Sequence, residues 1–586
     1  MAHHPVILKS LHQEENQQLY NLLEKISDQD KAWLSGYLYG VSQEIPQTTL
    51  SSSSYKVAIL YATQSGNSKG IAEDTTKQLK QQGIEASVYN MNNIKLKKLA
   101  EYQVILAVVA TYGEGEPPDD AIGFFEEITG KKKPFLKDIA FATLALGDSS
   151  YEHFCTAGHD FHQALQNLGA KPLADVFEAD LDFEEVAQNW QKHILEYLSS
   201  QQTAIAPEMI AAAASSSLPI ADYNREHPYS ATILKNQKIT GDESNLDIRH
   251  IEIDIADSGI SYQTGDDLGI WFENDTKLVD EIIAQIGANK DDIIELKGQK
   301  LPLKEALQSR LEITASTTKF ITQYAKISGA KKLEPLLKDK ASLREYAAQT
   351  QIIDVLKIKK TPIVAQDFIN MLRLLTPRLY SIASSPQDVD DEVHLSVKVI
   401  GYECNNQARF GGASGYLSRL KEDDNVRIYV ENNDKFRLPQ DDKNIIMIGD
   451  GTGIAPYRGF MYERQNNQAQ GKNWLLYNNP SFEQDFLYQS EWSGWQKNNL
   501  LTDYNFVWHK DGSKIGELLL EQANKIWQWL QDGAFVYVAG SQSHMAKAAH
   551  EALLRIAIEQ GGLDEKSART WMNELKSQNR YQRDIY

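Results

Sequence analysis

The chain has 586 residues, of which 42% are hydrophobic and 24% are charged, and its formal net charge is −20. This length is too great for one hydrophobic core, so we expect three or four domains of about 100–200 residues each. The acidic balance argues against nucleic acid and anionic membranes as partners, because phosphate surfaces attract Lys and Arg patches, and it favours docking to a basic protein face.

The cysteine content argues against a metal or disulfide framework. Cys155 and Cys404 are the two cysteines of the chain, and two cannot ligate an iron–sulfur cluster or a structural zinc by themselves. We therefore expect no metal site and a reducing, cytoplasmic location. No apolar run approaches the roughly 18 residues of a membrane span. Residues 1–10 lack a basic stretch followed by an apolar one, so we expect no signal peptide.

Residues 1–54 are predicted to be a helical extension that ends in a polar, Ser-rich linker, because Leu19, Leu22 and Leu23 recur at helical spacing among Glu and Gln. From residue 55 to 198, apolar runs alternate with Gly-containing loops and helices. This alternation predicts a doubly wound parallel sheet.

Residues 199–222 are rich in Ala, Ser and Gln and predict a flexible linker, with a helix over the Ala run as the alternative. Strand-like segments begin and end residues 223–435 and enclose a helical stretch at about 276–375. We expect an antiparallel β-barrel with a helical insert there. Residues 436–586 return to an α/β pattern, so the predicted fold class is α/β multidomain.

Three loops of the first α/β domain follow strand ends, where ligands of an open parallel sheet bind. The first loop offers hydroxyls and backbone N–H groups at a helix N-terminus, an anion nest without Lys or Arg. In the second loop, glycines let the backbone approach a flat ring that Tyr112 can cover, and the third loop offers Tyr151 for stacking. The candidate ligand-binding residues are Thr63, Gln64, Ser65, Gly66, Asn67, Ser68, Ala110, Thr111, Tyr112, Gly113, Leu146, Gly147, Asp148, Ser149, Ser150, Tyr151, Glu152, His153, Phe154 and Cys155.

In this order and spacing the three loops resemble those of the flavodoxin family, over roughly residues 55–198. The resemblance implies that the domain binds FMN and holds its phosphate with neutral donors. For His153 and Cys155, packing or a surface position is the favoured alternative to a ligand contact, because electron transfer between flavins needs no protein nucleophile.

A second site is predicted from the segment Arg378-Leu379-Tyr380-Ser381. An Arg can clamp a pyrophosphate with paired donors, and strand alternation places Arg378 and Tyr380 on one face and Leu379 and Ser381 on the other. Tyr380 can then pack on an isoalloxazine, while Ser381 approaches its reactive nitrogen. A second pyrophosphate nest is predicted from Gly411, Gly412, Ala413 and Ser414. A core strand and an unrelated turn are the alternative.

The chain ends Arg583-Asp584-Ile585-Tyr586, and this ending is similar to that of the ferredoxin–NADP reductase superfamily. The resemblance implies that Tyr586 stacks on FAD and moves before nicotinamide enters. It also implies that Ser381 and Asp584 assist hydride transfer. Further FAD contacts that it implies fall on Thr314, Ser396, Val397, Lys398 and Tyr402.

Together these parts resemble the diflavin reductases, and within them the flavoprotein subunits of assimilatory NADPH-dependent sulfite reductases. The residues that carry this resemblance lie at 32–37, 249–254, 376–385 and 433–439. It implies electron flow from NADPH through FAD and FMN to a sulfite reductase hemoprotein (beta) subunit, and self-association through the N-terminal segment. A general diflavin reductase for another haem acceptor, and a subunit with an impaired NADPH pocket, are the alternatives.

The nucleotide pocket departs from the family pattern. Asp450 stands where a small residue or proline is expected, Ser541 replaces an Asp, and His509-Lys510 replaces a Ser-Arg pair. Lys510 keeps a positive charge without the planar fork of Arg. Three interpretations stay open: weaker NADPH binding through Gly451, Thr452, His509 and Lys510, a changed donor such as NADH, or a vestigial pocket.

Overall fold

The computed structural model describes residues 56–63, 66–112, 115–118, 121–130, 136–137, 139–149, 153–181, 183–201, 223–510, 514–541 and 545–585. They lie within one compact unit that runs from Tyr55 to Tyr586. The predicted helical extension and most of the predicted linker lie outside the described residues. The same holds for seven candidate site residues, namely Gln64, Ser65, Gly113, Ser150, Tyr151, Glu152 and Tyr586.

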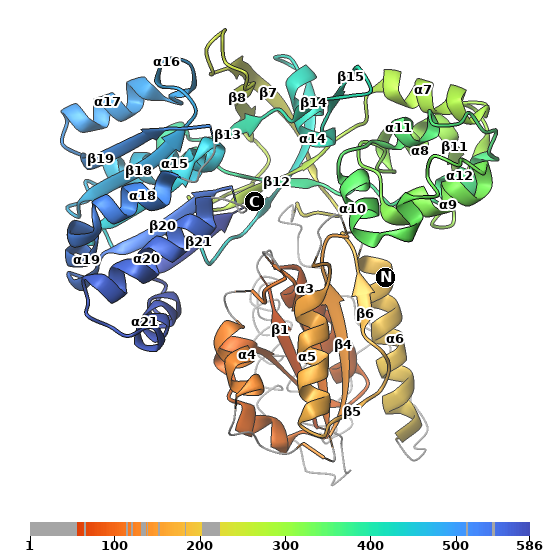
Figure 1. The fold of residues 1–586 in the computed structure, drawn as a ribbon, viewed down its shortest axis with the longest axis horizontal. Helices are drawn as coiled ribbons and strands as arrows, with labels where there is room; N and C mark the ends of the chain where they lie inside the picture. Colours follow the sequence, from red (N-terminus) through yellow and green to blue (C-terminus); the bar gives the residue numbers. More distant parts are fainter. Residues whose placement is uncertain are drawn as a thin grey trace, which may run out of the picture. The chain divides into compact units, whose positions relative to one another are not determined.

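The first α/β domain contains the predicted parallel sheet, in the order β2-β1-β3-β4-β5, with β6 also paired to β4 (Figure 1). Its strands are β1 Lys56–Ala62, β2 Glu85–Asn90, β3 Val104–Ala110, β4 Ala140–Leu146, β5 Lys171–Pro172 and β6 Phe177–Ala179. Its helices are α3 Asn67–Gln81, α4 Ile122–Thr129, α5 Thr156–Asn167 and α6 Glu184–Gln201, and the 3-10 turns η1 Met91–Asn93 and η2 Leu96–Glu101 follow β2.

Helices cover both faces of this sheet, which explains its continuous apolar runs. Val57 and Ile59 pack in one buried cluster, whereas Ala58 and Leu60 pack in another on the opposite face. Because successive strand residues point to opposite faces, four apolar residues in a row require two covered faces. The doubly wound architecture predicted from the sequence is therefore confirmed.

The second domain contains an antiparallel sheet in the order β12-β9-β16-β7-β8-β13 (Figure 1). Its strands are β7 Tyr229–Lys238, β8 Ile248–Asp254, β9 Asp267–Trp271, β12 Arg378–Ser381, β13 Glu392–Lys398 and β16 Asn425–Glu431. An isolated bridge between Ile382 and Leu395 joins the two end strands and closes the sheet. The hairpin β14 Gly401–Cys404 and β15 Gln407–Phe410, and the helices α13 Pro386–Val389 and α14 Gly412–Arg419, complete this domain.

The predicted helical insert lies between β9 and β12. Its helices are α7 Thr276–Ile286, α8 Leu303–Ser309, α9 Thr318–Ser328, α10 Lys340–Ala348, α11 Ile352–Leu356 and α12 Ala365–Ile369, with the 3-10 turn η3 Leu336–Lys338. It also contains a short hairpin, β10 Ile293–Leu296 and β11 Gln299–Pro302, that the sequence pattern did not predict.

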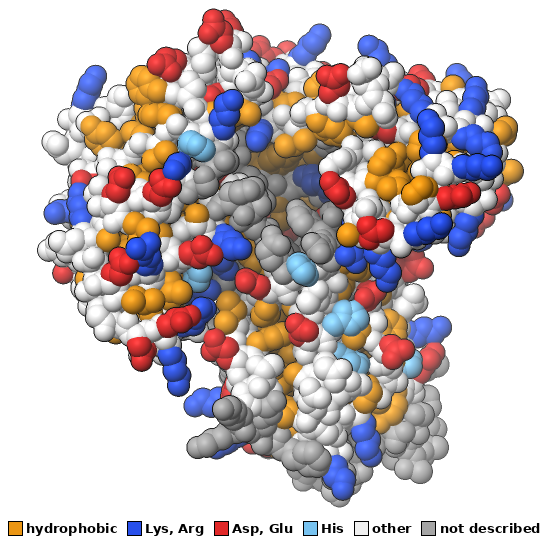
Figure 2. Space-filling model, in the orientation of Figure 1, with side chains coloured by type: hydrophobic (Ala, Val, Ile, Leu, Met, Phe, Trp, Pro, Cys, Tyr) orange, Lys and Arg blue, Asp and Glu red, His pale blue; other side chains and the backbone are white. Residues whose placement is uncertain are grey.

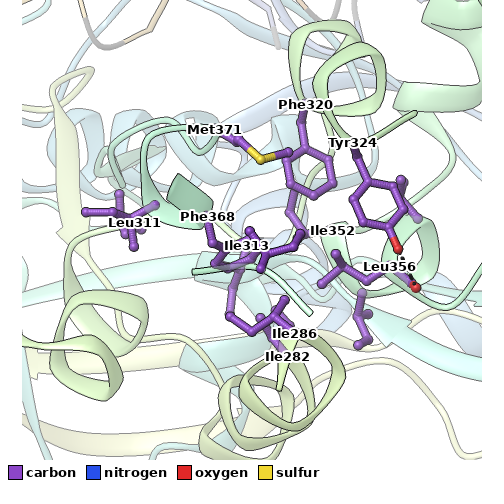
Figure 3. Close-up of a cluster of buried hydrophobic side chains, with 14 of the residues drawn as sticks. Ile282, Ile286, Leu311, Ile313, Phe320, Tyr324, Ile352, Leu356, Phe368 and Met371 are labelled. Carbon is purple, nitrogen blue, oxygen red and sulfur yellow. Dashed lines mark hydrogen bonds between the residues drawn. The ribbon is translucent and has the colours of Figure 1, made fainter. Parts of the chain in front are cut away.

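One apolar core holds the insert together, as Figure 3 shows. Phe320 and Tyr324 of α9 stack with their ring centroids 6.0 Å apart, and Phe368 of α12 packs edge-on against Phe320. The Tyr324 hydroxyl donates to the carbonyl oxygen of Leu356 at 3.0 Å, so the buried hydroxyl is satisfied.

The third domain is again a parallel sheet, in the order β19-β18-β17-β20-β21 (Figure 1). Its strands are β17 Ile445–Asp450, β18 Asn473–Asn479, β19 Leu501–Trp508, β20 Phe535–Gly540 and β21 Tyr581–Ile585. Its helices are α15 Ile454–Asn466, α16 Phe482–Asp485, α17 Gln489–Lys497, α18 Lys514–Glu521, α19 Ala523–Gln531, α20 Lys547–Glu559 and α21 Glu565–Ser577, with the 3-10 turn η4 Gly451–Gly453 after β17. Among the helices that the structure describes, none is long and apolar enough to cross a membrane.

Candidate flavin and nucleotide sites

A cavity of about 490 Å³ joins the loops of the parallel sheet to the strands of the antiparallel sheet. Nine of the predicted FMN-site residues line it, namely Asn67, Ala110, Thr111, Tyr112, Leu146, Gly147, Asp148, His153 and Phe154. The predicted FAD-site residues Arg378 and Leu379 of β12 line the same cavity. Residues from both predicted flavin sites therefore meet in one space.

The described residues of the first loop fit a phosphate site at the N-terminus of α3. The backbone N–H of Gly66 donates to the hydroxyl of Thr63 at 2.9 Å. Gly66 has a φ of +86° at the N-cap, a conformation that glycine adopts without strain. The hydroxyl of Ser68 is buried and has no hydrogen-bond partner among the described residues. A phosphate at this helix N-terminus would satisfy it, so the loop fits FMN.

Close packing in the second and third loops leaves no room for a side chain at two of their glycines. A Cβ on Gly147 would lie 3.0 Å from the backbone nitrogen of Cys155, and a Cβ on Gly115 would lie 2.7 Å from the Cβ of His153. Ser149 is held by Asp180, which accepts from its backbone N–H at 3.1 Å and from its hydroxyl. These contacts fix the positions of the two loops beside the cavity.

Cys155 itself packs away from the cavity. Its Sγ donates to the carbonyl oxygen of Ala145 at 3.3 Å, and burial raises the pKa of the thiol to about 12. The thiol is therefore protonated at neutral pH and is no nucleophile. This placement agrees with packing, the favoured alternative for this residue, while His153 lies on the cavity wall.

Arg378 is positioned through two neighbours. Its Nη1 donates to the hydroxyl of Thr376 at 2.9 Å, and its Nη2 lies 3.5 Å from a carboxylate oxygen of Glu312. The other oxygen of Glu312 accepts from the backbone N–H of Thr314 at 2.7 Å and from its hydroxyl at 2.6 Å. Glu312 is 2% exposed, so one buried carboxylate orients two predicted FAD-binding residues.

A second cavity, of about 220 Å³, lies at the N-terminus of α14 and is lined by Thr314, Gly411 and Gly412. A Cβ on Gly412 would lie 2.5 Å from the ring of Phe272 and 2.9 Å from the hydroxyl of Thr314, so only glycine fits. Lys277, Arg409 and Arg419 line this cavity, together with the carboxylates of Asp275 and Glu281. Arg409 is paired with Asp354 and Arg419 with Asp275. The backbone N–H groups at the N-terminus of α14 fit the pyrophosphate of FAD.

Leu379 and Tyr380 of β12 lie in different surroundings. Leu379 is 40% exposed and lines the larger cavity, whereas Tyr380 packs against Phe272, Leu375 and Ala413 beside α14. Leu379 therefore lies on the wall shared with the FMN loops, and the packing of Tyr380 on an isoalloxazine stays a prediction.

Ser381 and Asp584 lie together although 203 residues separate them in the sequence. The Ser381 hydroxyl donates to Oδ2 of Asp584 at 2.6 Å. Burial raises the pKa of the Asp584 carboxyl group above its usual range. Tyr112 of the second FMN loop reaches the same strand, because its hydroxyl donates to the carbonyl oxygen of Ile585 at 3.2 Å.

The remaining FAD candidates of β13 and the β14–β15 hairpin lie elsewhere. Ser396 is hydrogen-bonded to the hydroxyl of Tyr488 at 2.6 Å, Val397 is buried in the barrel core and Lys398 is exposed. Tyr402 is half-buried on the hairpin, and burial raises its pKa. None of these four is among the described residues that line the two cavities.

Two residues at which the nucleotide pocket departs from the family pattern, Asp450 and Ser541, are hydrogen-bonded to each other. Asp450, at the end of β17, accepts from the backbone N–H of Ser541 at 2.8 Å and from its hydroxyl at 2.6 Å. The carboxylate therefore has two donors in the loop after β20. Gly451 follows with a φ of +51°, and its carbonyl oxygen accepts from Tyr477 at 2.5 Å.

The predicted 2′-phosphate residues lie at the carboxyl end of β19. The backbone N–H of His509 donates to Asn479 at 2.8 Å, which continues the pairing of β18 with β19, and Lys510 is exposed. Ligands of a parallel sheet bind at this edge. Lys510, Gly451 and Thr452 all follow strand ends at the same edge.

Three family models match successive parts of the chain: "Flavodoxin" over residues 59–190, "FAD binding domain" over 221–416 and "Oxidoreductase NAD-binding domain" over 447–551. The sulfite reductase (NADPH) flavoprotein alpha-component of Vibrio parahaemolyticus is 41% identical over 602 residues, which cover 99% of this chain and 96% of the relative. The corresponding protein of Vibrio cholerae is 43% identical, covering 97% and 95%, and that of Zymomonas mobilis is 42% identical, covering 97% of each.

The chain belongs to the sulfite reductase (NADPH) flavoprotein alpha-component family. This confirms the resemblance inferred from its motifs.

Three carboxylates of this family member were missed by the sequence analysis. Glu312 orients Arg378 and Thr314, and Asp180 holds Ser149. Asp267 lies opposite Ser381 on the neighbouring strand β9. Acidic residues are common on surfaces, so residue type alone did not distinguish these three. A carboxylate within two residues of a predicted site, such as Glu312 before Thr314, was the one available signal.

Proposed function

We propose that this chain carries electrons from NADPH through FAD and FMN to a sulfite reductase hemoprotein. The cavity that the FMN loops share with β12 carries this proposal, because it brings the two flavin sites to one space. When bound, the two flavins would supply hydride acceptance and single-electron delivery.

The residues of the chain supply binding and orientation. Gly66 and Ser68 would hold the FMN phosphate at the N-terminus of α3. Arg378 and Gly412 would hold the FAD pyrophosphate, and the Ser381–Asp584 pair would orient the nicotinamide side. We assign the FMN domain to residues 55–198, the FAD domain with its insert to 223–435 and the nucleotide domain to 436–586.

The pairing of Asp450 with Ser541 supports a working nucleotide pocket. A carboxylate beside a pyrophosphate is repulsive unless it is engaged elsewhere. In this chain Asp450 accepts two hydrogen bonds from Ser541, and its loop keeps the left-handed Gly451. This arrangement favours weaker NADPH binding over a vestigial pocket.

Sulfite reduction itself is proposed to occur on another chain. The thiol of Cys155 is buried against Ala145, and Cys404 lies on the hairpin β14–β15, so the two do not form a cluster site. With two cysteines in 586 residues, we also propose a reducing, cytoplasmic location. By its family membership we also propose that residues 1–54 mediate self-association.

The test uses the purified flavin-loaded chain, anaerobic NADPH and three acceptors. Cytochrome c and ferricyanide should be reduced, whereas sulfite should be reduced only after the hemoprotein is added. Sulfite turnover by the chain alone would contradict the division of labour. Flavin absorbance that does not bleach with NADPH, but does with dithionite, would contradict the proposed electron donor.

A further inference from the structure

A row of polar side chains crosses three strands of the antiparallel sheet. Ser381 of β12 pairs with Asp267 of β9, and Asp267 pairs on its other side with Glu431 of β16. Residues directly opposite each other in antiparallel strands point to the same face, with Cβ atoms about 4.5–5.5 Å apart. Leu379 and Glu431 of this face line the cavity that the FMN loops share, so Asp267 lies on the same face.

Asp584 approaches this row from the third domain. Its Oδ2 accepts from the hydroxyl of Ser381 at 2.6 Å. Ser381 has one hydroxyl proton, so it cannot also donate to Asp267. A hydrogen bond between Asp267 and the Ser381 oxygen therefore requires a proton on Asp267.

The charges around Asp267 favour the protonated form of its carboxyl group. Its neighbours Asp584, Asp266 and Glu431 are all acidic. Asp266 accepts a hydrogen bond from the guanidinium of Arg437, and the positive charge of Arg225 acts on Glu431. Burial, and then the charge of Asp584, raise the pKa of Asp267 well above its usual range. Asp267 and Asp584 are both half-buried, and two close carboxyl groups that are partly shielded from water tend to share one proton rather than ionise together.

We propose that Asp267 and Asp584 form one carboxyl pair around Ser381, in which Asp267 is a positioning residue that keeps a proton next to the Ser381 hydroxyl. A proton can pass from Asp267 to the Ser381 oxygen while the Ser381 proton passes to Asp584. This relay moves one proton and one negative charge between the two carboxyl groups and leaves Ser381 unchanged. The proposal relies on the proposed function only in treating Ser381 as part of the hydride-transfer site.

Infrared spectroscopy of the whole flavin-loaded protein tests the pair directly. At neutral pH the wild-type chain should show the carbonyl stretch of a protonated carboxyl group, and Asp267→Asn should lose intensity in that band. Asp434→Asn is the matched control, because the side chain of Asp434 is 84% exposed and its loss should leave the band unchanged. A wild-type spectrum without any such band would overturn the proposal, even if the variant did not fold.

The pH profile of flavin reduction by NADPH, measured in single turnovers, separates positioning from a structural role. The wild-type pair loses its last proton next to a carboxyl group that is already charged, whereas Asp584 in Asp267→Asn ionises without that neighbour. The limb of the profile that reports the pair should therefore shift to lower pH in the variant. A lower rate at every pH with an unshifted profile would overturn the proposal. The infrared result does not depend on sulfite or on the hemoprotein, so it can fail while the proposed function holds.

Discussion

Glu312 illustrates how single residues position the flavin site. It lies two residues before Thr314 and accepts two hydrogen bonds from it, while its second oxygen faces Arg378. The guanidinium thus has a fixed direction before any ligand arrives, which lowers the ordering cost of binding. Its planar fork then matches the paired oxygens of a pyrophosphate.

We expect Arg378→Lys to weaken FAD binding selectively. Lysine keeps the charge but loses the fork, and a hydrogen bond to a charged group contributes about 1.5–3 kcal/mol. FAD affinity should therefore fall about tenfold to a hundredfold, as measured by titrating the flavin-depleted protein with FAD. FMN affinity should not change. Arg555→Lys, on the exposed face of α20, is the control, and equal effects of the two variants would contradict the assigned role.

Lys510 should distinguish the two nicotinamide nucleotides. Its exposed ammonium group at the end of β19 is the proposed partner of the 2′-phosphate that NADH lacks. Lys510→Glu should weaken NADPH about tenfold or more and leave NADH nearly unchanged. The KM for each nucleotide in ferricyanide reduction measures this. Lys472→Glu, at the amino end of β18 and also exposed, is the matched control, and an equal loss for both nucleotides at position 510 would reject the assignment.

At the scale of elements, β8 and β13 meet the third domain through a buried histidine pair. His250 is hydrogen-bonded to the hydroxyl of Tyr488 at 3.0 Å and to Glu252 at 3.2 Å. His394 is hydrogen-bonded to Glu392, and Arg458 lies 3.4 Å from its other ring nitrogen. Ligand atoms of His250, Glu252 and His394 lie within 4.8 Å of one another. The nearby Arg458 cation opposes a metal ion there, so we interpret the group as a hydrogen-bond network.

This network predicts a loss of stability in acid. Burial, with the charge of Arg458 second, lowers the pKa of His250 to about 3. The unfolded chain binds a proton at this residue below about pH 6.5, whereas the folded chain does not until about pH 3. The free energy of unfolding should therefore fall by roughly 1.4 kcal/mol per pH unit across that window from this residue alone.

The measurement compares denaturant unfolding of the wild type and His250→Gln between pH 4 and pH 8. The variant should lose part of the acid slope, and the two curves should run parallel above pH 6.5. His193→Gln is the control, because His193 lies on α6 of the first domain, outside this network. Parallel curves over the whole range would contradict the assignment.

The helical insert should depend on its own apolar core. Phe320 is fully buried and packs against Tyr324 and Phe368 (Figure 3). Phe320→Ala should lower the free energy of unfolding by about 3–5 kcal/mol, because it removes burial and leaves a cavity. Ile327→Ala on the same helix, where Ile327 is 50% exposed, should change it by less than about 1 kcal/mol. Thermal or denaturant unfolding measures both variants, and equal losses would contradict the core described for this element.

For the whole molecule, the sequence predicted the elements with strong periodicity and missed short or long-range features. Apolar runs such as 104–110 predicted buried parallel strands correctly, because a short continuous apolar run between turn residues is typical of a strand covered on both faces. The four-residue strands β10 and β11 are too short to show a period. The pairing of Asp450 with Ser541 spans 91 residues, so each residue alone looked like a defect of the pocket.

For the candidate sites too, local features were predicted from the sequence and long-range features were missed. Loop residues such as Asn67 and Gly147 were found because they follow strand ends, and a parallel sheet gathers its strand ends at one edge. Which residue of β12 faces the FMN loops depends on how strands from two domains face one space, and local alternation cannot specify that. Acidic and basic side chains are interspersed on the face shown in Figure 2, so charge alone does not mark these sites.

The central claim is that one chain holds two different flavins in neighbouring sites. The most direct measurement is the flavin content of the fully loaded protein after denaturation, separated by chromatography. We expect FMN and FAD in equal amounts, one of each per chain, and a lower amount of FAD, but not of FMN, in Arg378→Lys. Release of a single kind of flavin from fully loaded protein would contradict it.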